Sequence, residues 1–260
     1  MPAQQHFDIT ILSFILATPF FLLIILYGIA VIKSNQSYRQ WPWYHTACWI
    51  GGNVLCILAV AGPLAEASHQ FFSVHMVAHL LLGMIGPLFM VLAKPVTLLL
   101  RSLPVKTARK VTTTLKMRPF HLLLNPLFTT VLNIGGLWLL YRTELFTMMH
   151  HSMVLYTVIH AHIFLAGYFF TASIIYIDKL HQGYSFQFRA IILILALAGH
   201  QILAKSFYGY PPSSVERMEA EKGSMIMYYG GDIVDLVIII IFSYQWFKVT
   251  KPKRYQPHSV

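Results

Sequence analysis

Apolar runs recur along the chain, and each is close to the roughly 20 residues that a helix needs to cross the hydrocarbon core of a bilayer. Short polar loops separate them, and a longer one covers 208–223. We therefore predict an all-α, polytopic membrane protein, a seven-helix bundle in which residues 1–260 form one integral membrane domain. The expected spans are 9–32, 46–63, 74–100, 122–141, 152–176, 189–207 and 228–247.

The basic residues predict how this bundle lies in the membrane. Fifteen of the 19 lysines and arginines fall in alternate loops, the adjoining span ends and the tail, and the other four are Arg142, Lys205, Arg217 and Lys222. Because cytoplasmic loops carry an excess of lysine and arginine, we expect the N-terminus outside and the C-terminus inside. The same pattern explains the net charge of +10 without a nucleic-acid partner.

Composition agrees with a lipid environment, since 57% of the residues are hydrophobic and 11% are charged. Cys48 and Cys56 lie eight positions apart in one apolar run, so we expect two unpaired, buried thiols rather than a disulfide. The sequence leaves open whether the protein is a homo-oligomer.

Histidine and aspartate supply the candidate chemistry. Eight of the 13 histidines fall in or just above the predicted outer third of the bilayer. His75 and His79, four residues apart, would share one helix face in the geometry of a ligand pair. His160 and His162 are two apart and point to nearly opposite faces, so we expect one of them to be structural. The candidate metal ligands are His75, His79, His160, His162, His200, Asp232 and Asp235.

Asp232 and Asp235, three residues apart, are expected to share a face as ligands, as acceptors that orient imidazoles, or as part of a proton path. Several methionines are predicted near the same surface: Met76, Met148, Met149, Met153, Met225 and Met227. Imidazole together with thioether suits copper, especially Cu(I). Ordinary packing is the competing interpretation for the methionines, and interhelical hydrogen bonding is the competing interpretation for each histidine.

The segment HMVAHLLLGMIGPLFMVLAKPVTLLLR, residues 75–101, resembles the signature span of the CtaG family of cytochrome c oxidase assembly factors. The resemblance continues through Asn125-Pro126, the segment HAHIFLAGYFF and the segment YYGGDIVDL. It implies a non-enzymatic role in maturing a haem-copper oxidase in a bacterial cell membrane, with copper supplied to an oxidase subunit. The positions it carries over are His75, His79, one of His160 and His162, and Asp235, followed by His200 and Asp232.

Two other classes of protein remain as alternatives. A haem-binding electron-transfer protein would place haem between facing histidines, with Gly83, Gly86 and Gly167 making room for the ring. A metal- or proton-coupled transporter would use Asp232 and Asp235 as coupling groups, although the chain shows no internal repeat.

Overall fold

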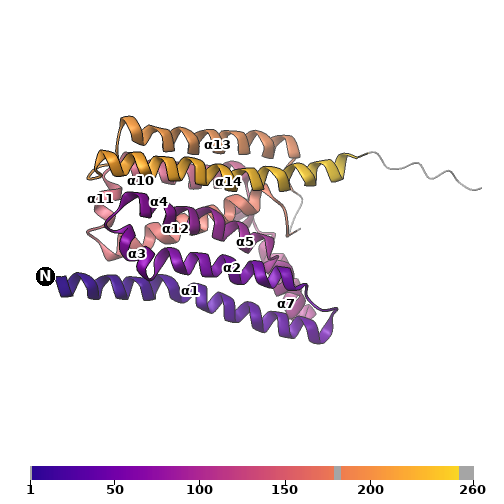
Figure 1. The fold of residues 1–260 in the computed structure, drawn as a ribbon. Helices are drawn as coiled ribbons and strands as arrows, with labels where there is room; N and C mark the ends of the chain where they lie inside the picture. The colour runs from indigo at the N-terminus through magenta and orange to yellow at the C-terminus, as the bar shows by residue number, and fades with distance from the viewer. Residues whose placement is uncertain (1, 179–182, 252–260) are drawn as a thin grey trace, which may run out of the picture.

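Six helices are long and apolar enough to cross a membrane in the computed structural model, which describes residues 2–178 and 183–251 apart from the side chains of residues 2–11. They are Leu12–Ser37 in α1 (Pro2–Ser37), α2 (Trp43–Val60), Phe72–Leu92, α12 (Met153–Ile174), α13 (Phe186–Gly209) and α14 (Arg217–Thr250). The third of these comprises α4 (Phe72–Leu80), the π-helical turn η1 (Leu81–Ile85) and α5 (Gly86–Leu92). The long helices lie side by side in Figure 1.

The predicted span 122–141 is a shorter helical stretch made of α9 (Pro126–Thr130), the π-helical turn η2 (Val131–Gly135) and α10 (Gly136–Arg142). Asn125 caps its start, since its Oδ1 accepts hydrogen bonds from the amides of Leu127 and Phe128. The Asn125 amide also donates to the Tyr184 hydroxyl (2.9 Å), and Arg142 Nη1 donates to the Tyr210 carbonyl (2.9 Å). Because Tyr184 precedes α13 and Tyr210 follows it, the stretch extends along the whole of α13.

Short helices lie at the two ends of the bundle. In Figure 1, α3 (Pro63–Ser68) and α11 (Leu145–Met149) lie at the end where α4 begins, and α7 (Val105–Leu115) lies at the opposite end. The remaining short helices are α6 (Pro95–Ser102) and α8 (Arg118–Leu123).

Two predicted span ends differ most from the helices of the structure. The span expected to continue to residue 100 ends at Leu92, and α6 begins after Lys94, which has a left-handed backbone (φ 53°). Proline lacks an amide hydrogen and disfavours helix in the residue before it, so Pro95 starts a new helix. The Asp178 carboxylate caps this helix by accepting hydrogen bonds from the amides of Val96 and Thr97 (both 3.1 Å).

The polar loop expected at 208–223 is helical from Arg217 onwards, so α14 begins well before the predicted residue 228. Two ion pairs between residues three and four apart, Lys222–Glu219 (3.1 Å) and Arg217–Glu221 (3.2 Å), support its first turns. Glu219 also accepts a hydrogen bond from the Ser73 hydroxyl (2.7 Å) on α4. These contacts fix α14 beside α4.

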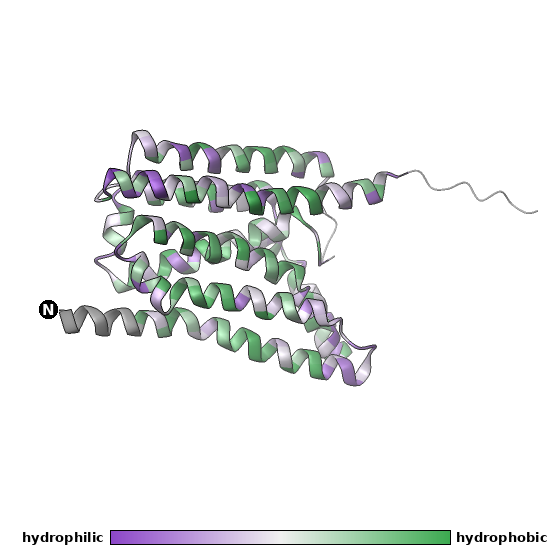
Figure 2. Cartoon of the chain, in the orientation of Figure 1, coloured by the Kyte–Doolittle hydropathy of each residue, from purple (hydrophilic) through white to green (hydrophobic). Residues whose placement is uncertain are grey.

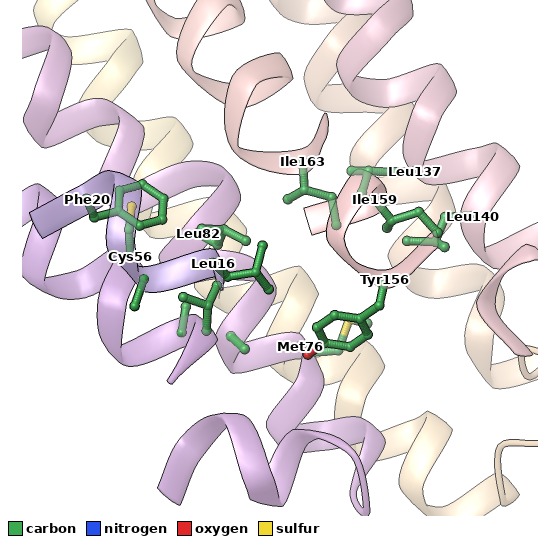
Figure 3. Packing of buried hydrophobic residues seen from close by; sticks show 14 of the residues in the cluster. Leu16, Phe20, Cys56, Met76, Leu82, Leu137, Leu140, Tyr156, Ile159 and Ile163 are labelled. Carbon is green, nitrogen blue, oxygen red and sulfur yellow. The ribbon is translucent and has the colours of Figure 1, made fainter. Parts of the chain in front are cut away.

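Apolar packing holds the bundle together. The larger of two buried clusters joins α1, α2, α4, α10 and α12, and Figure 3 shows Phe20, Cys56, Met76, Tyr156 and Ile163 from it. Cys48 and Cys56 are both free thiols, as expected, but only Cys56 is buried and Cys48 is half-buried. Hydrophobic residues also cover the outer surfaces of the long helices, and hydrophilic ones gather towards the helix ends (Figure 2). That distribution is typical of a surface that faces lipid.

Small residues allow the helices to approach closely. A Cβ atom at Gly167 would lie 1.9 Å from the Gly83 carbonyl oxygen, and one at Gly86 would lie 2.4 Å from Cys56 Sγ. The space beside the glycines that the haem alternative requires is therefore occupied by neighbouring backbone and side-chain atoms. They serve helix packing of the small-residue type common in membranes.

Candidate functional site

His75 and His79 are both buried on the inward face of α4, one helical turn apart as predicted. They contact different partners. His75 Nε2 lies 3.1 Å from the Tyr141 hydroxyl at the end of α10, and its ring lies 6.4 Å from that of His160, centroid to centroid. The His79 ring stacks towards His200 of α13, with centroids 6.4 Å apart. Tyr141 also lies beside His79, with ring centroids 6.5 Å apart.

His79, His200 and Asp235 surround a cavity of about 20 Å³ inside the bundle. Within the part of the chain that the structure describes, neither nitrogen of His79 or of His200 has a hydrogen-bond partner, and the same is true of Asp235 Oδ2. A space of this size holds about one water molecule or a small ion. Buried polar atoms normally find a partner, so five unpaired atoms around one cavity mark a site for a polar occupant.

A second group of histidines lies towards the end of the bundle that carries α3 and α11. The His160 Nδ1–H donates to the Tyr156 carbonyl (2.9 Å), which leaves Nε2 as its basic nitrogen. Tyr156 stacks on His160 (centroids 3.9 Å apart) and on His69 (5.0 Å). His69 in turn lies against His150, with centroids 5.6 Å apart. Burial lowers the pKa of His69, so this imidazole is neutral at pH 7.

Two of the candidate ligands, His162 and Asp232, point away from both histidine groups. His162 is exposed on the outer face of α12, and its Nε2–H donates to the Leu132 carbonyl (3.1 Å) in the π-helical turn η2. Of the two histidines on α12, it is thus His160 that faces inward.

The expectation that Asp232 and Asp235 share a face is wrong. Asp235 is buried, whereas Asp232 is exposed and accepts a hydrogen bond from the Gln201 amide. Residues three apart on a helix still differ by about 60° in direction, which separates the two at the edge of a packed face.

The predicted methionines divide in the same way. Met76, Met149 and Met227 are buried in the apolar core, and Met148, Met153 and Met225 are exposed. Met84, which the sequence did not single out, lines the cavity beside His79. Tyr141 and Tyr156 were also missed. No sequence signal marks them, because their role depends on which helix lies opposite.

Among residues 2–178 and 183–251, no group of three or more histidine, cysteine, aspartate or glutamate side chains is already arranged as a metal site. The donor types around the cavity, two imidazoles, one carboxylate and one thioether, do suit copper. The residues therefore fit a copper ion in chemical type, and their side chains would have to move to enclose it.

A family model described as the cytochrome c oxidase caa3 assembly factor (Caa3_CtaG) matches residues 25–249, which confirms the resemblance seen in residues 75–101. Uncharacterized proteins of Mycobacterium bovis and Mycobacterium tuberculosis are each 30% identical to the chain over 158 residues, 58% of this chain and 24% of each relative. One of Mycobacterium leprae is 26% identical over 159 residues, with the same coverage. The chain thus spans about a quarter of the length of these relatives. No solved structure matches it.

Proposed function

The chain belongs to the cytochrome c oxidase caa3 assembly factor family, and we propose that it binds copper inside the bundle and supplies it to a subunit of a haem-copper oxidase. The role is non-enzymatic, since the chain would hold and release an ion without changing a covalent bond. The family description supports the oxidase as partner, and the residues around the cavity support the metal.

The observation that carries the metal proposal is the set of unpaired nitrogens on His79 and His200 beside Asp235 Oδ2. Neutral imidazole is a copper ligand, and the unpaired nitrogens of these two residues are free to bind one. Asp235 would balance the charge of the ion or orient an imidazole. Copper bound in the bundle would give these atoms the partners that the protein itself does not supply.

His75 and His160 form a second pair of candidate metal ligands, closer to the end of the bundle that carries α3 and α11. With their rings 6.4 Å apart and Tyr141 beside both His75 and His79, this pair lies between the cavity and the outer histidines His69 and His150. A chain of imidazoles in this order would let an ion pass between the cavity and that end of the protein. That end carries few lysines and arginines, which favours the outer side of the membrane.

The proposed topology has seven spans, with the N-terminus outside and the C-terminus inside. The stretch Pro126–Arg142 would be the fourth span, although it is shorter than the six long helices. Its support is that its two ends bond to residues at opposite ends of α13. A segment that extends along a membrane-spanning helix in this way crosses the same layer.

The test is copper retention by the purified protein, with its visible absorption spectrum recorded on the same sample. We expect stoichiometric copper and no Soret band. His79→Ala and His200→Ala should each lower copper retention by about tenfold or more, and the double variant should add little, because ligands of one ion act together. His75→Ala should also lower copper retention if the pair of His75 and His160 shares the ion.

The matched control is His162→Ala, which removes an exposed imidazole of α12 that does not line the cavity. It should retain copper like the parent. Parental retention by both His79→Ala and His200→Ala would refute the metal site, and a Soret band would favour the haem alternative.

A further inference from the structure

A cavity of about 930 Å³ lies at the other end of the bundle from the two histidine groups described above. Its lining comes from segments far apart in the sequence and includes Lys94, Phe120 of α8, Tyr168 of α12, Arg189 of α13 and Lys248 of α14. The volume is within the range of about 300–1,000 Å³ that small-molecule sites occupy. The proposed copper site makes no use of this cavity.

Its charge is unbalanced. Among the described lining residues there are three cations, Lys94, Arg189 and Lys248, and a single acid, Asp178. The Asp178 carboxylate already accepts hydrogen bonds within the protein. It caps α6 through the amides of Val96 and Thr97, and it also accepts a hydrogen bond from the Thr97 hydroxyl. The cavity therefore presents an excess of positive charge to an occupant.

Arg189 is the most informative of the three cations, since its side chain is buried with 2% exposure. Its Nη1 donates to the Ile174 carbonyl (2.6 Å), whereas its Nε has no hydrogen-bond partner among residues 2–178 and 183–251. The rings of Tyr176, Phe186 and Phe242 lie 4.1, 4.4 and 5.2 Å from the guanidinium carbon. Among the described residues no carboxylate forms an ion pair with it. A buried cation without an anion is costly, so an anionic occupant would stabilise it.

The rest of the wall is apolar and includes Val91, Leu124, Phe169 and Ile241. No histidine, cysteine or methionine occurs among the described lining residues, so a haem iron or a soft metal has no ligand there. Cations together with many apolar side chains in one cavity are complementary to an amphiphile with an anionic head. Basic pockets between membrane helices on the side rich in lysine and arginine bind such headgroups.

We propose that this cavity binds an anionic phospholipid from the membrane leaflet on the basic side of the protein. The phosphate lies among Lys94, Arg189 and Lys248, and an acyl chain lies along the apolar wall. The proposal is independent of copper binding, because no residue of the histidine groups lines this cavity.

The experiment is native mass spectrometry of the full chain in neutral detergent, titrated with phosphatidylglycerol or with phosphatidylcholine. The parent should retain phosphatidylglycerol in preference to phosphatidylcholine. Lys94→Gln and Lys248→Gln should each reduce the bound fraction by about fivefold, as expected for the loss of one basic contact with an anionic lipid. Arg189→Gln should reduce it further.

Lys110→Gln is the matched control, because Lys110 is an exposed lysine of α7 that does not line the cavity. It should bind like the parent. Since Arg189 is buried and its variant is the one that can misfold, the two lysine variants decide the result. Equal binding of the two lipids, or parental binding by both lysine variants, would overturn the proposal. If inorganic phosphate displaces the lipid at the same concentration as unlabelled phosphatidylglycerol does, the lipid assignment is overturned, because the acyl chain would then add nothing to the affinity.

Discussion

Asp232 and Asp235 are close neighbours on α14 with opposite environments, which makes them a natural comparison. Asp235 lines the cavity with His79 and His200, whereas Asp232 faces outward beside Gln201. We predict that Asp235→Asn, which keeps the size and removes the charge, lowers copper retention about tenfold while the protein remains in the membrane at parental levels. Metal analysis and immunoblotting of membranes measure both quantities.

The control for this prediction is Asp232→Asn, which should retain copper like the parent. If Asp235→Asn removes the protein from the membrane, Asp235 is a folding residue. Equal effects of the two substitutions would contradict a role for the cavity.

His69 predicts how stability depends on pH. It lies between α3 and α4 against Tyr156, and burial lowers its pKa below the ordinary value of 6.5. As the pH falls below 6.5, His69 therefore takes up a proton in the unfolded chain before it does so in the folded protein. The contribution of His69 to the free energy of unfolding is thus full above pH 6.5 and is lost as the pH falls towards the lowered pKa. Thermal unfolding in detergent should give a Tm that falls between about pH 7 and pH 5.

His69→Gln should make this fall smaller, because the group that couples folding to protonation is gone. A parental slope in His69→Gln would show that other groups cause the effect.

At the residue scale, the four-residue spacing predicts correctly that two residues share a face of one helix. Sequence spacing does not predict which way that face points or which residue of another helix it contacts. The four-residue interval placed His75 and His79 on one buried face. The two-residue interval implied that His160 and His162 differ, but only the position of η2 shows that His162 is the outward one. No sequence pattern identifies Tyr141 for the same reason, because its hydroxyl contacts His75 from another helix.

At the scale of the elements, the contact between Gly83 and Gly167 brings η1 and α12 together. A Cβ atom at Gly167 would lie 1.9 Å from the Gly83 carbonyl oxygen, a backbone atom that cannot rotate away. We predict that Gly167→Ala forces the helices apart and destabilises the protein by about 1–3 kcal/mol. A lower Tm in the same detergent would measure this effect.

Gly28→Ala is the control, because a Cβ atom at Gly28 on α1 has nothing within 4 Å. Replacing a helical glycine by alanine there should raise stability by about 0.5–1 kcal/mol. Opposite signs for the two substitutions are therefore expected. Parental stability of Gly167→Ala would mean that this contact is looser than the structure indicates.

Hydropathy located the long helices well and their ends less well. It extended the third span through Ala93 and Lys94 because 74–100 is apolar almost throughout, and composition alone does not reveal a break. Pro95 is the local signal of that break, and the Asp178 cap that supports α6 comes from a residue more than 80 positions away. The start of α14 was missed because its first turns are polar and gain support from Ser73 on α4.

For the whole molecule, the two ends of the bundle differ in chemistry. One end carries the histidine groups and few cations, and the other carries Lys94, Arg189, Lys248 and the basic helix α7. The direction of the proposed copper transfer therefore depends on how the protein is oriented in the membrane, so the topology bears on both proposals.

Reporter fusions test that orientation directly. Fusions after Lys110 and after Lys251 should report the cytoplasm, and fusions after Ser68 and after Glu144 should report the exterior, because the basic loops are retained inside. The Glu144 position decides the number of spans. If Pro126–Arg142 crosses the membrane, Glu144 lies opposite Lys110, and if it does not, both report the same side. A cytoplasmic signal at Ser68 would place the histidine-rich end inside and contradict copper delivery at the outer face.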